Sequence, residues 1–252
     1  TGLLLGNRKA AVAQFSFLRL LGTGAIYSKY NCASELIDDK ILVDVGNGVL
    51  KELRKVNYDL SKLKMIIITH LHADHYADLP ALILNLEVEE DLKPIYIVGP
   101  KGLKENLTEL CHIYYQDFFD KFFEEKIKFI EILPETKSIE IFNDYDIKVQ
   151  KVDHYNIESY GYIINNKIGI TGDTCLCKEV LNIFENSEIV ITDISMIEGT
   201  NYHMGINDIE TIRKTYKNKI IATHLRDDTR EELKKKCLKD VIIKEDGVEM
   251  II

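Results

Sequence analysis

Short apolar runs alternate with longer amphipathic stretches along the chain, and this alternation predicts the elements of the fold. In the first half, apolar runs of strand length occupy residues 15–21, 33–37, 41–45, 64–69 and 94–98. Apolar side chains recur at helical spacing over residues 49–56, 77–89 and 103–123. The first three predicted strands follow one another closely enough to pair as a meander.

The second half of the chain repeats this scheme. Predicted strands occupy residues 128–132, 138–142, 146–153, 160–164, 167–171, 188–192 and 219–223. Predicted helices occupy residues 178–185, 207–216 and 229–237, and the chain closes with two short strands. Each half therefore contains several strands and then alternates helix with strand. This pattern favours an α/β fold in which two sheets pack together with helices outside.

The composition is that of an ordinary globular protein. The chain has 252 residues, of which 46% are hydrophobic and 29% charged, and it contains no linker, low-complexity tract or short-period repeat. We therefore predict a single domain over residues 1–252. The formal net charge of −9 provides no general attraction to a polyanion. An extended nucleic acid is therefore not the favoured partner.

The cysteines and the apolar runs indicate in which compartment of the cell the protein is expected. The five cysteines are odd in number and lack paired metal-type spacing, so we expect reduced, cytoplasmic thiols. The longest apolar runs, such as residues 65–68, are far shorter than a bilayer span, and we expect no membrane partner. No signal-peptide pattern is present. The chain opens at Thr1 rather than at Met, which is consistent with a truncated or foreign first segment.

The candidate chemistry is concentrated in the motif His70-Leu71-His72-Ala73-Asp74-His75, directly after the predicted strand 64–69. A loop leaving that strand is expected to aim His70 and His72 to one side, and Asp74 and His75 to another. Imidazole and carboxylate without thiolate suit Zn²⁺, with Mn²⁺ or Fe as alternatives.

Three further residues occupy similar places at the ends of predicted strands: His154, Asp173 and His224. Gly172 precedes Asp173 and permits a close approach of the backbone. Two metals that share a bridging carboxylate need about seven ligands. Together with the motif, these residues make seven.

On these residues the chain resembles the metallo-β-lactamase-fold superfamily, whose signature is the His-x-His-x-Asp-His loop followed in order by His, Asp and His. The resemblance covers nearly the whole chain and implies a four-layer αβ/βα sandwich with two mixed sheets. It also implies that His70, His72 and His154 hold one divalent metal ion, and that Asp74, His75 and His224 hold the second. Asp173 would bridge the two ions, and Asp44 would orient a ligand or a bridging water. Relatives often form dimers, so a homodimer is a further expectation from resemblance.

Within the superfamily, three features resemble the phosphodiesterase branch that includes ribonuclease Z. These are the Gly99-Pro100 turn, the Gly172-Asp173-Thr174 sequence, and His203, which precedes His224 by 21 residues. In that branch a histidine at a comparable spacing protonates the leaving oxygen. The resemblance implies a metal-dependent hydrolase in which a bridging hydroxide attacks phosphorus, with Asp74 and His203 as catalytic residues. The predicted substrate is a small phosphodiester or a nucleotide.

Two alternatives on the same scaffold remain open. The first is a carboxyl-ester, lactone or thioester hydrolase, which needs the same ligands but not His203. The second is a ribonuclease Z-type tRNA 3′-processing endonuclease. Such enzymes usually carry a long Gly-rich arm between the residues that match His154 and Asp173, and here these are only 19 positions apart.

Aromatic pairs with acids between them mark the segment 114–123. Their spacing is that of a helical stripe, and ordinary core packing is the favoured interpretation. Base stacking or a dimer contact is the alternative.

Overall fold

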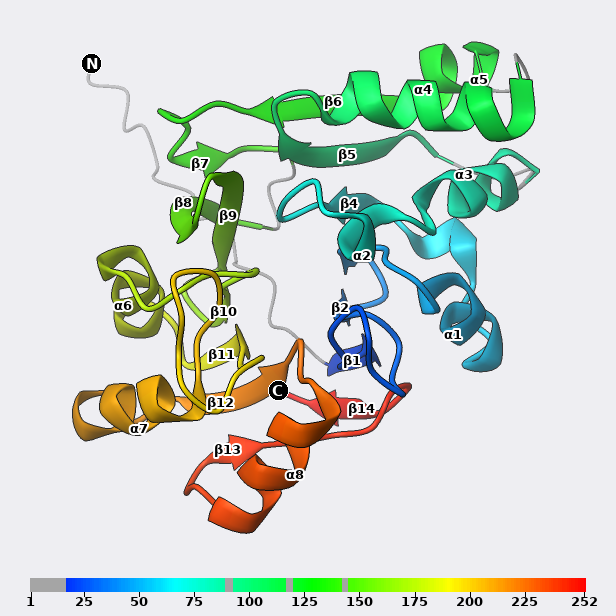
Figure 1. Ribbon diagram of the computed structural model, residues 1–252. Helices are drawn as coiled ribbons and strands as arrows, with labels where there is room; N and C mark the ends of the chain where they lie inside the picture. Colours follow the sequence, from blue (N-terminus) through cyan, green and yellow to red (C-terminus); the bar gives the residue numbers. More distant parts are fainter. Residues whose placement is uncertain (1–16, 89–92, 117–119, 142–144) are drawn as a thin grey trace, which may run out of the picture.

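Two seven-stranded sheets pack face to face in the computed structural model, which describes residues 17–88, 93–116, 120–141 and 145–252 (Figure 1). The first sheet contains, in spatial order, β14 (Glu249–Ile251), β1 (Phe17–Gly22), β2 (Ser34–Ile37), β3 (Ile41–Val43), β4 (Met65–Ile67), β5 (Ile95–Pro100) and β6 (Ile127–Ile132). The second contains β13 (Val241–Ile242), β12 (Lys219–Thr223), β11 (Ile189–Asp193), β10 (Ile168–Ile170), β9 (Ile157–Ile164), β8 (Ile147–His154) and β7 (Ser138–Ile139).

Each sheet is mixed, as the sequence predicts. In the first sheet β14, β1, β2 and β3 pair antiparallel, and β3 to β6 pair parallel. In the second sheet β7 to β10 pair antiparallel, and β10 to β13 pair parallel. The central parallel strands β3, β4, β10 and β11 are short and rich in Ile, Val and Leu, because both of their faces are buried.

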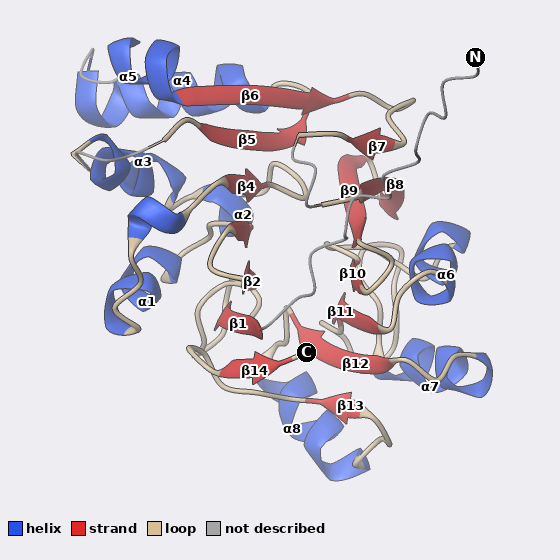
Figure 2. Ribbon diagram, turned by 180° about the vertical axis from the view of Figure 1, so that it is seen from behind, coloured by secondary structure: helices blue, strands red, loops and turns tan. Residues whose placement is uncertain are grey.

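Helices cover the outer faces of both sheets (Figure 2). The helices beside the first sheet are α1 (Val49–Lys55), α2 (Ala73–Tyr76), α3 (Leu79–Glu87), α4 (Leu103–Tyr115) and α5 (Asp120–Lys126), with a 3₁₀ turn at Leu60–Lys62. Those beside the second are α6 (Lys178–Glu185), α7 (Ile206–Thr215) and α8 (Asp227–Lys236). The predicted sandwich with helices outside is therefore confirmed.

Three apolar clusters correspond to the layers. The central cluster joins the facing sides of the sheets, for example Ile67 of β4 and Ile191 of β11. Leu82 of α3 packs in a second cluster on the outer face of the first sheet. Ile209 of α7 packs in a third cluster on the outer face of the second sheet.

Several predicted boundaries are wrong. The single helix expected over residues 103–123 is divided into α4 and α5. The first ends at Tyr115, and the next residue, Gln116, has φ of 58°. The helix expected over 77–89 begins at Leu79, with Pro80 in its first turn, where its missing N–H costs nothing. The strand expected over 138–142 is only β7, and residues 142–144 lie outside the described part of the chain.

The topology brings distant segments to one edge. Strands β8 and β10 run in the same direction because both pair antiparallel with β9. The carboxyl ends of β8, β10, β11 and β12 therefore lie at one edge of the second sheet, and those of β3 and β4 lie together in the first. Among the described residues, no helix is both long and apolar enough to cross a membrane.

The packing between the sheets makes a testable prediction at Ile191, which is fully buried in the central cluster. Ile191→Ala should lower the free energy of unfolding by about 2–5 kcal/mol, because it removes apolar contacts and leaves a cavity. The matched control is Ile251→Ala on the edge strand β14, where the side chain is 89% exposed and the change should stay within about 0.5 kcal/mol. Urea denaturation followed by circular dichroism measures both, and equal losses would contradict the proposed core.

Candidate metal centre

The sequence-predicted ligands meet where the two sheets face each other. They come from the segment after β4 (His70, His72, Asp74 and His75), the end of β8 (His154), the turn after β10 (Asp173) and the turn after β12 (His224). All are buried except His72, which is partly exposed. The structure therefore brings together all seven residues singled out from the sequence.

The segment after β4 differs from the expected loop in one respect. Asp74 and His75 lie in the short helix α2, and His72 is its N-cap residue. The helical turn separates Asp74 and His75 from His70, which lies between β4 and the helix. Asp74 lies in the first turn, where the helix dipole stabilises a carboxylate.

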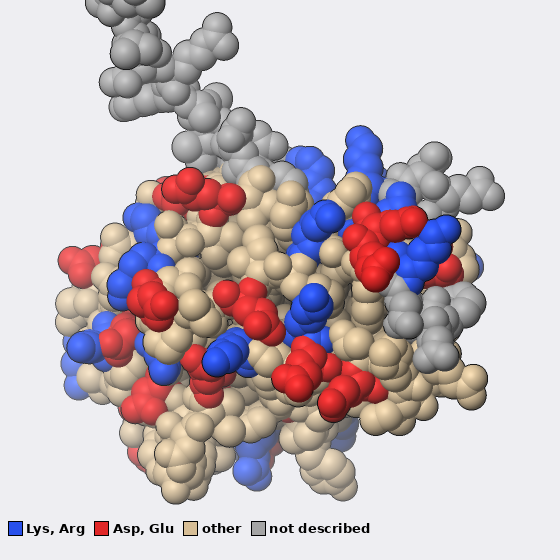
Figure 3. Space-filling view, turned by 90° about the horizontal axis from the view of Figure 1, so that it is seen from above, with Lys and Arg blue, Asp and Glu red and all other residues tan. Residues whose placement is uncertain are grey.

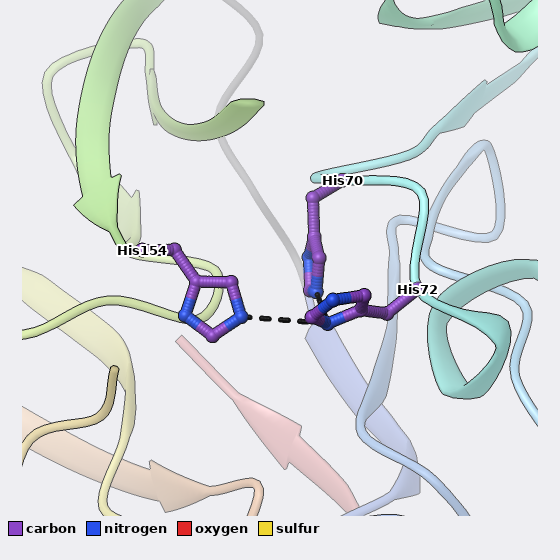
Figure 4. Close-up of side chains that lie close together, drawn as sticks. All are labelled: His70, His72 and His154. Carbon is purple, nitrogen blue, oxygen red and sulfur yellow. Dashed lines mark hydrogen bonds between the residues drawn. The ribbon is translucent and has the colours of Figure 1, made fainter. Parts of the chain in front are cut away.

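His70, His72 and His154 form the first group of facing side chains (Figure 4). His72 Nδ1 lies 3.0 Å from His70 Nε2 and 3.4 Å from His154 Nε2. His154 Nδ1 donates to the carbonyl oxygen of Tyr202 at 2.7 Å, so in the neutral ring Nε2 carries a lone pair. The three imidazole nitrogens therefore lie close enough together to bind one cation.

The second group consists of Asp74, His75, Asp173 and His224. His224 Nε2 lies 3.2 Å from Asp74 Oδ2 and 3.2 Å from Asp173 Oδ2. His75 Nε2 lies 3.3 Å from Asp173 Oδ2 but forms no hydrogen bond within the described structure. The same Asp173 oxygen lies 3.9 Å from His70 Nε2, so this carboxylate stands between the two groups.

The other nitrogen of each buried imidazole is held by a neighbouring group. His75 Nδ1 donates to Asp44 Oδ2 at 2.7 Å, and His224 Nδ1 lies 2.6 Å from Ser195 Oγ. His70 Nδ1 lies 3.1 Å from Thr69 Oγ1. Such bonds fix the tautomer and direct the remaining nitrogen inward, which is the usual arrangement around metal-ligating histidines.

Asp44 connects several parts of this arrangement. Its backbone has φ of 54° at the turn after β3. Its carboxylate accepts from the N–H and the hydroxyl of Thr69, each at 2.8 Å, as well as from His75. These contacts match the orienting position that the family resemblance implies for Asp44.

Gly172 permits the approach of Asp173. It has φ of 61°, and a Cβ at this position would lie 3.0 Å from Thr69 Cβ and 3.1 Å from the carbonyl oxygen of Tyr160. A side chain here would therefore strain the backbone and crowd both sheets.

The buried carboxylates make the site favourable to positive charge. Burial by itself lowers the pKa of His224, but Asp173, Asp193 and Asp74 raise it to about 10. Burial likewise opposes the charge of His75, but Asp173 and Asp44 raise its pKa well above the usual value. His70 behaves oppositely, because burial and then the charge of His75 lower its pKa. The donor set of imidazoles and carboxylates therefore fits divalent cations.

His203 lies at the margin of the second group. Its Nδ1 is 2.8 Å from Asp193 Oδ2, and its ring stacks on that of His224 with centroids 5.2 Å apart. Burial lowers its pKa, but the hydrogen bond and charge of Asp193 outweigh burial, and the net pKa is raised.

Asp193 is a site residue that the sequence reasoning missed. It ends β11, directly after the predicted strand 188–192, which is the placement that marked His154, Asp173 and His224. Its carboxylate also accepts from Ser195. The same strand-end placement therefore marks Asp193 in the sequence.

The aromatic residues of segment 114–123 that the structure describes belong to α4 and α5. Phe122 is buried in the outer cluster of the first sheet, and Tyr115 and Phe123 pack against it, as the core interpretation predicts. Tyr114 is 57% exposed. Phe118 and Phe119 lie outside the described residues.

Comparisons with known proteins agree with this architecture. Over 260 residues the chain is 28% identical to a ribonuclease Z of Borrelia recurrentis, covering 87% of this chain and 77% of that protein. A ribonuclease Z of Lachnoclostridium phytofermentans is 31% identical over 134 residues, covering 53% of this chain and 41% of that protein. The chain thus matches less than half the length of that relative.

Among solved structures, the metallo-β-lactamase-fold protein YhfI from Bacillus subtilis superposes with a TM-score of 0.76 and 20% identity, covering 95% of this chain and all of that one. This likeness confirms the predicted fold. The names of the relatives confirm the predicted kinship with the ribonuclease Z branch.

A more specific match is to the family described as Anti-Pycsar protein Apyc1, which extends over residues 17–246 and so includes every residue of the metal centre. Because this match covers nearly the whole chain, the protein belongs to the Anti-Pycsar protein Apyc1 family of the metallo-β-lactamase fold.

Proposed function

We propose that this protein is a dinuclear metal-dependent phosphodiesterase that hydrolyses a small phosphodiester or nucleotide. The observation that carries the proposal is the pairing of His203 with Asp193 beside the cluster of seven candidate ligands. Metal-dependent hydrolysis of an ester or lactone requires the cluster alone, whereas a phosphodiester with a poor leaving group also benefits from a proton donor.

The candidate ligands divide into two sets around Asp173. His70, His72 and His154 would hold one ion, and Asp74, His75 and His224 the other, with Asp173 shared. Zn²⁺ suits these nitrogen and oxygen donors, and Mn²⁺ or Fe are alternatives. Such a pair supplies Lewis acidity, lowering the pKa of water from about 16 toward 7 and neutralising charge on phosphate.

Asp74 is placed to handle the proton of the attacking water. Its carboxylate accepts from His224 at 3.2 Å, and His75 and His224 outweigh the effect of burial to lower its pKa. It therefore stays ionised at neutral pH and can orient the nucleophile or accept a proton from it.

His203 is placed to protonate the departing oxygen. Asp193 accepts from Nδ1, so the opposite nitrogen, Nε2, is the one that can donate. The raised pKa keeps the imidazolium form populated nearer to neutral pH. Asp193 acts here as a positioning residue that fixes the tautomer and orientation of His203.

The charge distribution favours a small substrate. On the face shown in Figure 3, Lys and Arg side chains are interspersed with Asp and Glu. The net charge of −9 also opposes the docking of a long polyanion. The named relatives are ribonucleases, so tRNA 3′-processing is the second candidate, and a direct assay separates the two.

The first prediction concerns substrate class. Protein loaded with Zn²⁺ or Mn²⁺ should hydrolyse 2′,3′- or 3′,5′-cyclic nucleotides and should cleave neither a lactone nor a thioester at a comparable rate. A chelator should abolish the activity, and added metal should restore it. Rapid 3′ processing of a precursor tRNA would favour the second candidate. Activity confined to the lactone or thioester would overturn the proposal.

His203→Ala provides the second prediction. Turnover of a phosphodiester should fall about 10²–10⁴-fold, because the leaving oxygen loses its proton donor. Metal content, measured by mass spectrometry, should be unchanged. The matched comparison is a p-nitrophenyl diester, whose good leaving group needs less protonation and should show a smaller loss. If His203→Ala loses metal, His203 is a ligand and the proposed role is wrong.

Asp193→Asn provides the third prediction. Asn retains an acceptor for His203 but removes the negative charge that raises the pKa of His203. Only protonated His203 donates, so kcat/KM should fall as pH rises through this pKa. In the variant this fall should shift to lower pH, with metal content preserved. An unchanged pH–rate profile would show that Asp193 does not tune His203.

A further inference from the structure

Two exposed tyrosines stand directly beside the metal centre, one next to each of two site histidines. Tyr155 follows His154 and is 56% exposed, and Tyr202 precedes His203 and is 44% exposed. Their ring centroids are 5.1 Å apart with an interplanar angle of 50°. The same two segments expose Ile157 and Ile197, so the apolar surface extends beyond the pair.

The backbone holds Tyr202 in a defined position. Its carbonyl oxygen accepts from His154 Nδ1 at 2.7 Å, which ties it to a candidate ligand. The N–H groups of Tyr202 and His203 both donate to Thr200 Oγ1 at 3.1 Å, and the Thr200 N–H donates to the His203 carbonyl oxygen. A compact turn therefore presents the Tyr202 ring and His203 together.

Tyr155 is held at the turn of the β8–β9 hairpin. The flanking residues His154 and Ile157 pair across the hairpin. Tyr155 has φ of 54°, a conformation that Gly or Asn adopts more easily than an aromatic residue. Exposed aromatic rings add little to stability, so packing alone does not account for a strained tyrosine at this turn.

We propose that Tyr155 and Tyr202 form an aromatic platform that binds the nucleobase of the substrate on the leaving-group side of the metal centre. This inference rests on the proposed function and assigns the residues that contact the base of its substrate. His154 and His203 have ring centroids 5.1 Å apart, so the platform borders both the ligand set and the proton donor. In a cyclic nucleotide the leaving oxygen belongs to the ribose that carries the base. His203 would then protonate an oxygen of the same nucleoside whose base stacks on Tyr202.

The test compares two diesters that differ only in the base. One is the cyclic nucleotide that wild type cleaves fastest, and the other is the methyl riboside carrying the same cyclic phosphate. Stacking on an aromatic side chain should give wild type a preference for the nucleotide of about 5- to 150-fold in kcat/KM. Tyr202→Leu and Tyr155→Leu should each reduce this ratio, and Tyr202→Phe should retain it.

Tyr216→Leu is the matched control. Tyr216 is a partly buried tyrosine that packs on Phe184 at the far end of α7, one helix length or roughly 15 Å from Gly205. Its loss should leave the nucleotide preference unchanged. Equal rates of wild type on both diesters would overturn the platform, as would a Tyr202→Phe variant as impaired as Tyr202→Leu.

Calorimetry separates failure of the platform from failure of the proposed function. Metal-loaded wild type should bind a nucleoside 5′-monophosphate more tightly than inorganic phosphate, and Tyr202→Leu should reduce that advantage. If this holds while no phosphodiester is cleaved, the platform stands and the phosphodiesterase proposal fails. If diesters are cleaved without any dependence on Tyr155 or Tyr202, the platform is wrong and the proposed function stands.

Discussion

The site depends on buried imidazoles that are hydrogen-bonded on one nitrogen and directed inward on the other. Asp44, Ser195 and the carbonyl oxygen of Tyr202 each hold one such ring. Because each partner comes from a different segment, these bonds connect the turn after β3 with α2, the turn after β11 with the turn after β12, and the loop before α7 with the end of β8. The same hydrogen bonds therefore orient the candidate ligands and hold the surrounding turns in place.

Burying these polar groups lowers the free energy of unfolding, and the rest of the fold must compensate for that cost. A buried polar atom without a partner costs about 1–3 kcal/mol, a substantial part of the 5–15 kcal/mol that stabilises a typical domain. His75 Nε2 makes no hydrogen bond although Asp173 Oδ2 lies 3.3 Å away, and imidazole nitrogens of His70, His72 and His154 face one another. The apolar cluster between the sheets supplies the compensating burial, and cation binding would satisfy the inward nitrogens directly.

The loops around the candidate ligands carry side chains that could decide which reaction the site performs. Seven ligands of this kind serve many reactions, so the chemistry must be decided by what surrounds them. Here Asp193 holds His203 beside the cluster, and Tyr155 and Tyr202 border the same side. In the proposed function His203 would donate the proton and the two tyrosines would bind the base, an arrangement suited to hydrolysis of a nucleotide ester.

The sequence by itself determined the fold class and the candidate ligands. Strands such as β4 and β12 were predictable because a strand buried on both faces is a nearly unbroken apolar run. The candidate ligands were predictable because a dense local motif and three further residues follow strand ends. The division of residues 103–123 at Gln116, the short helix α2 and the role of Asp193 were not predictable. Each depends on a contact between segments far apart in the chain or on a single backbone angle, and hydrophobic periodicity reports neither. Only the tertiary structure placed Asp193 against His203 and Tyr155 against Tyr202, because packing of one segment on another, rather than local preference, brings those side chains together.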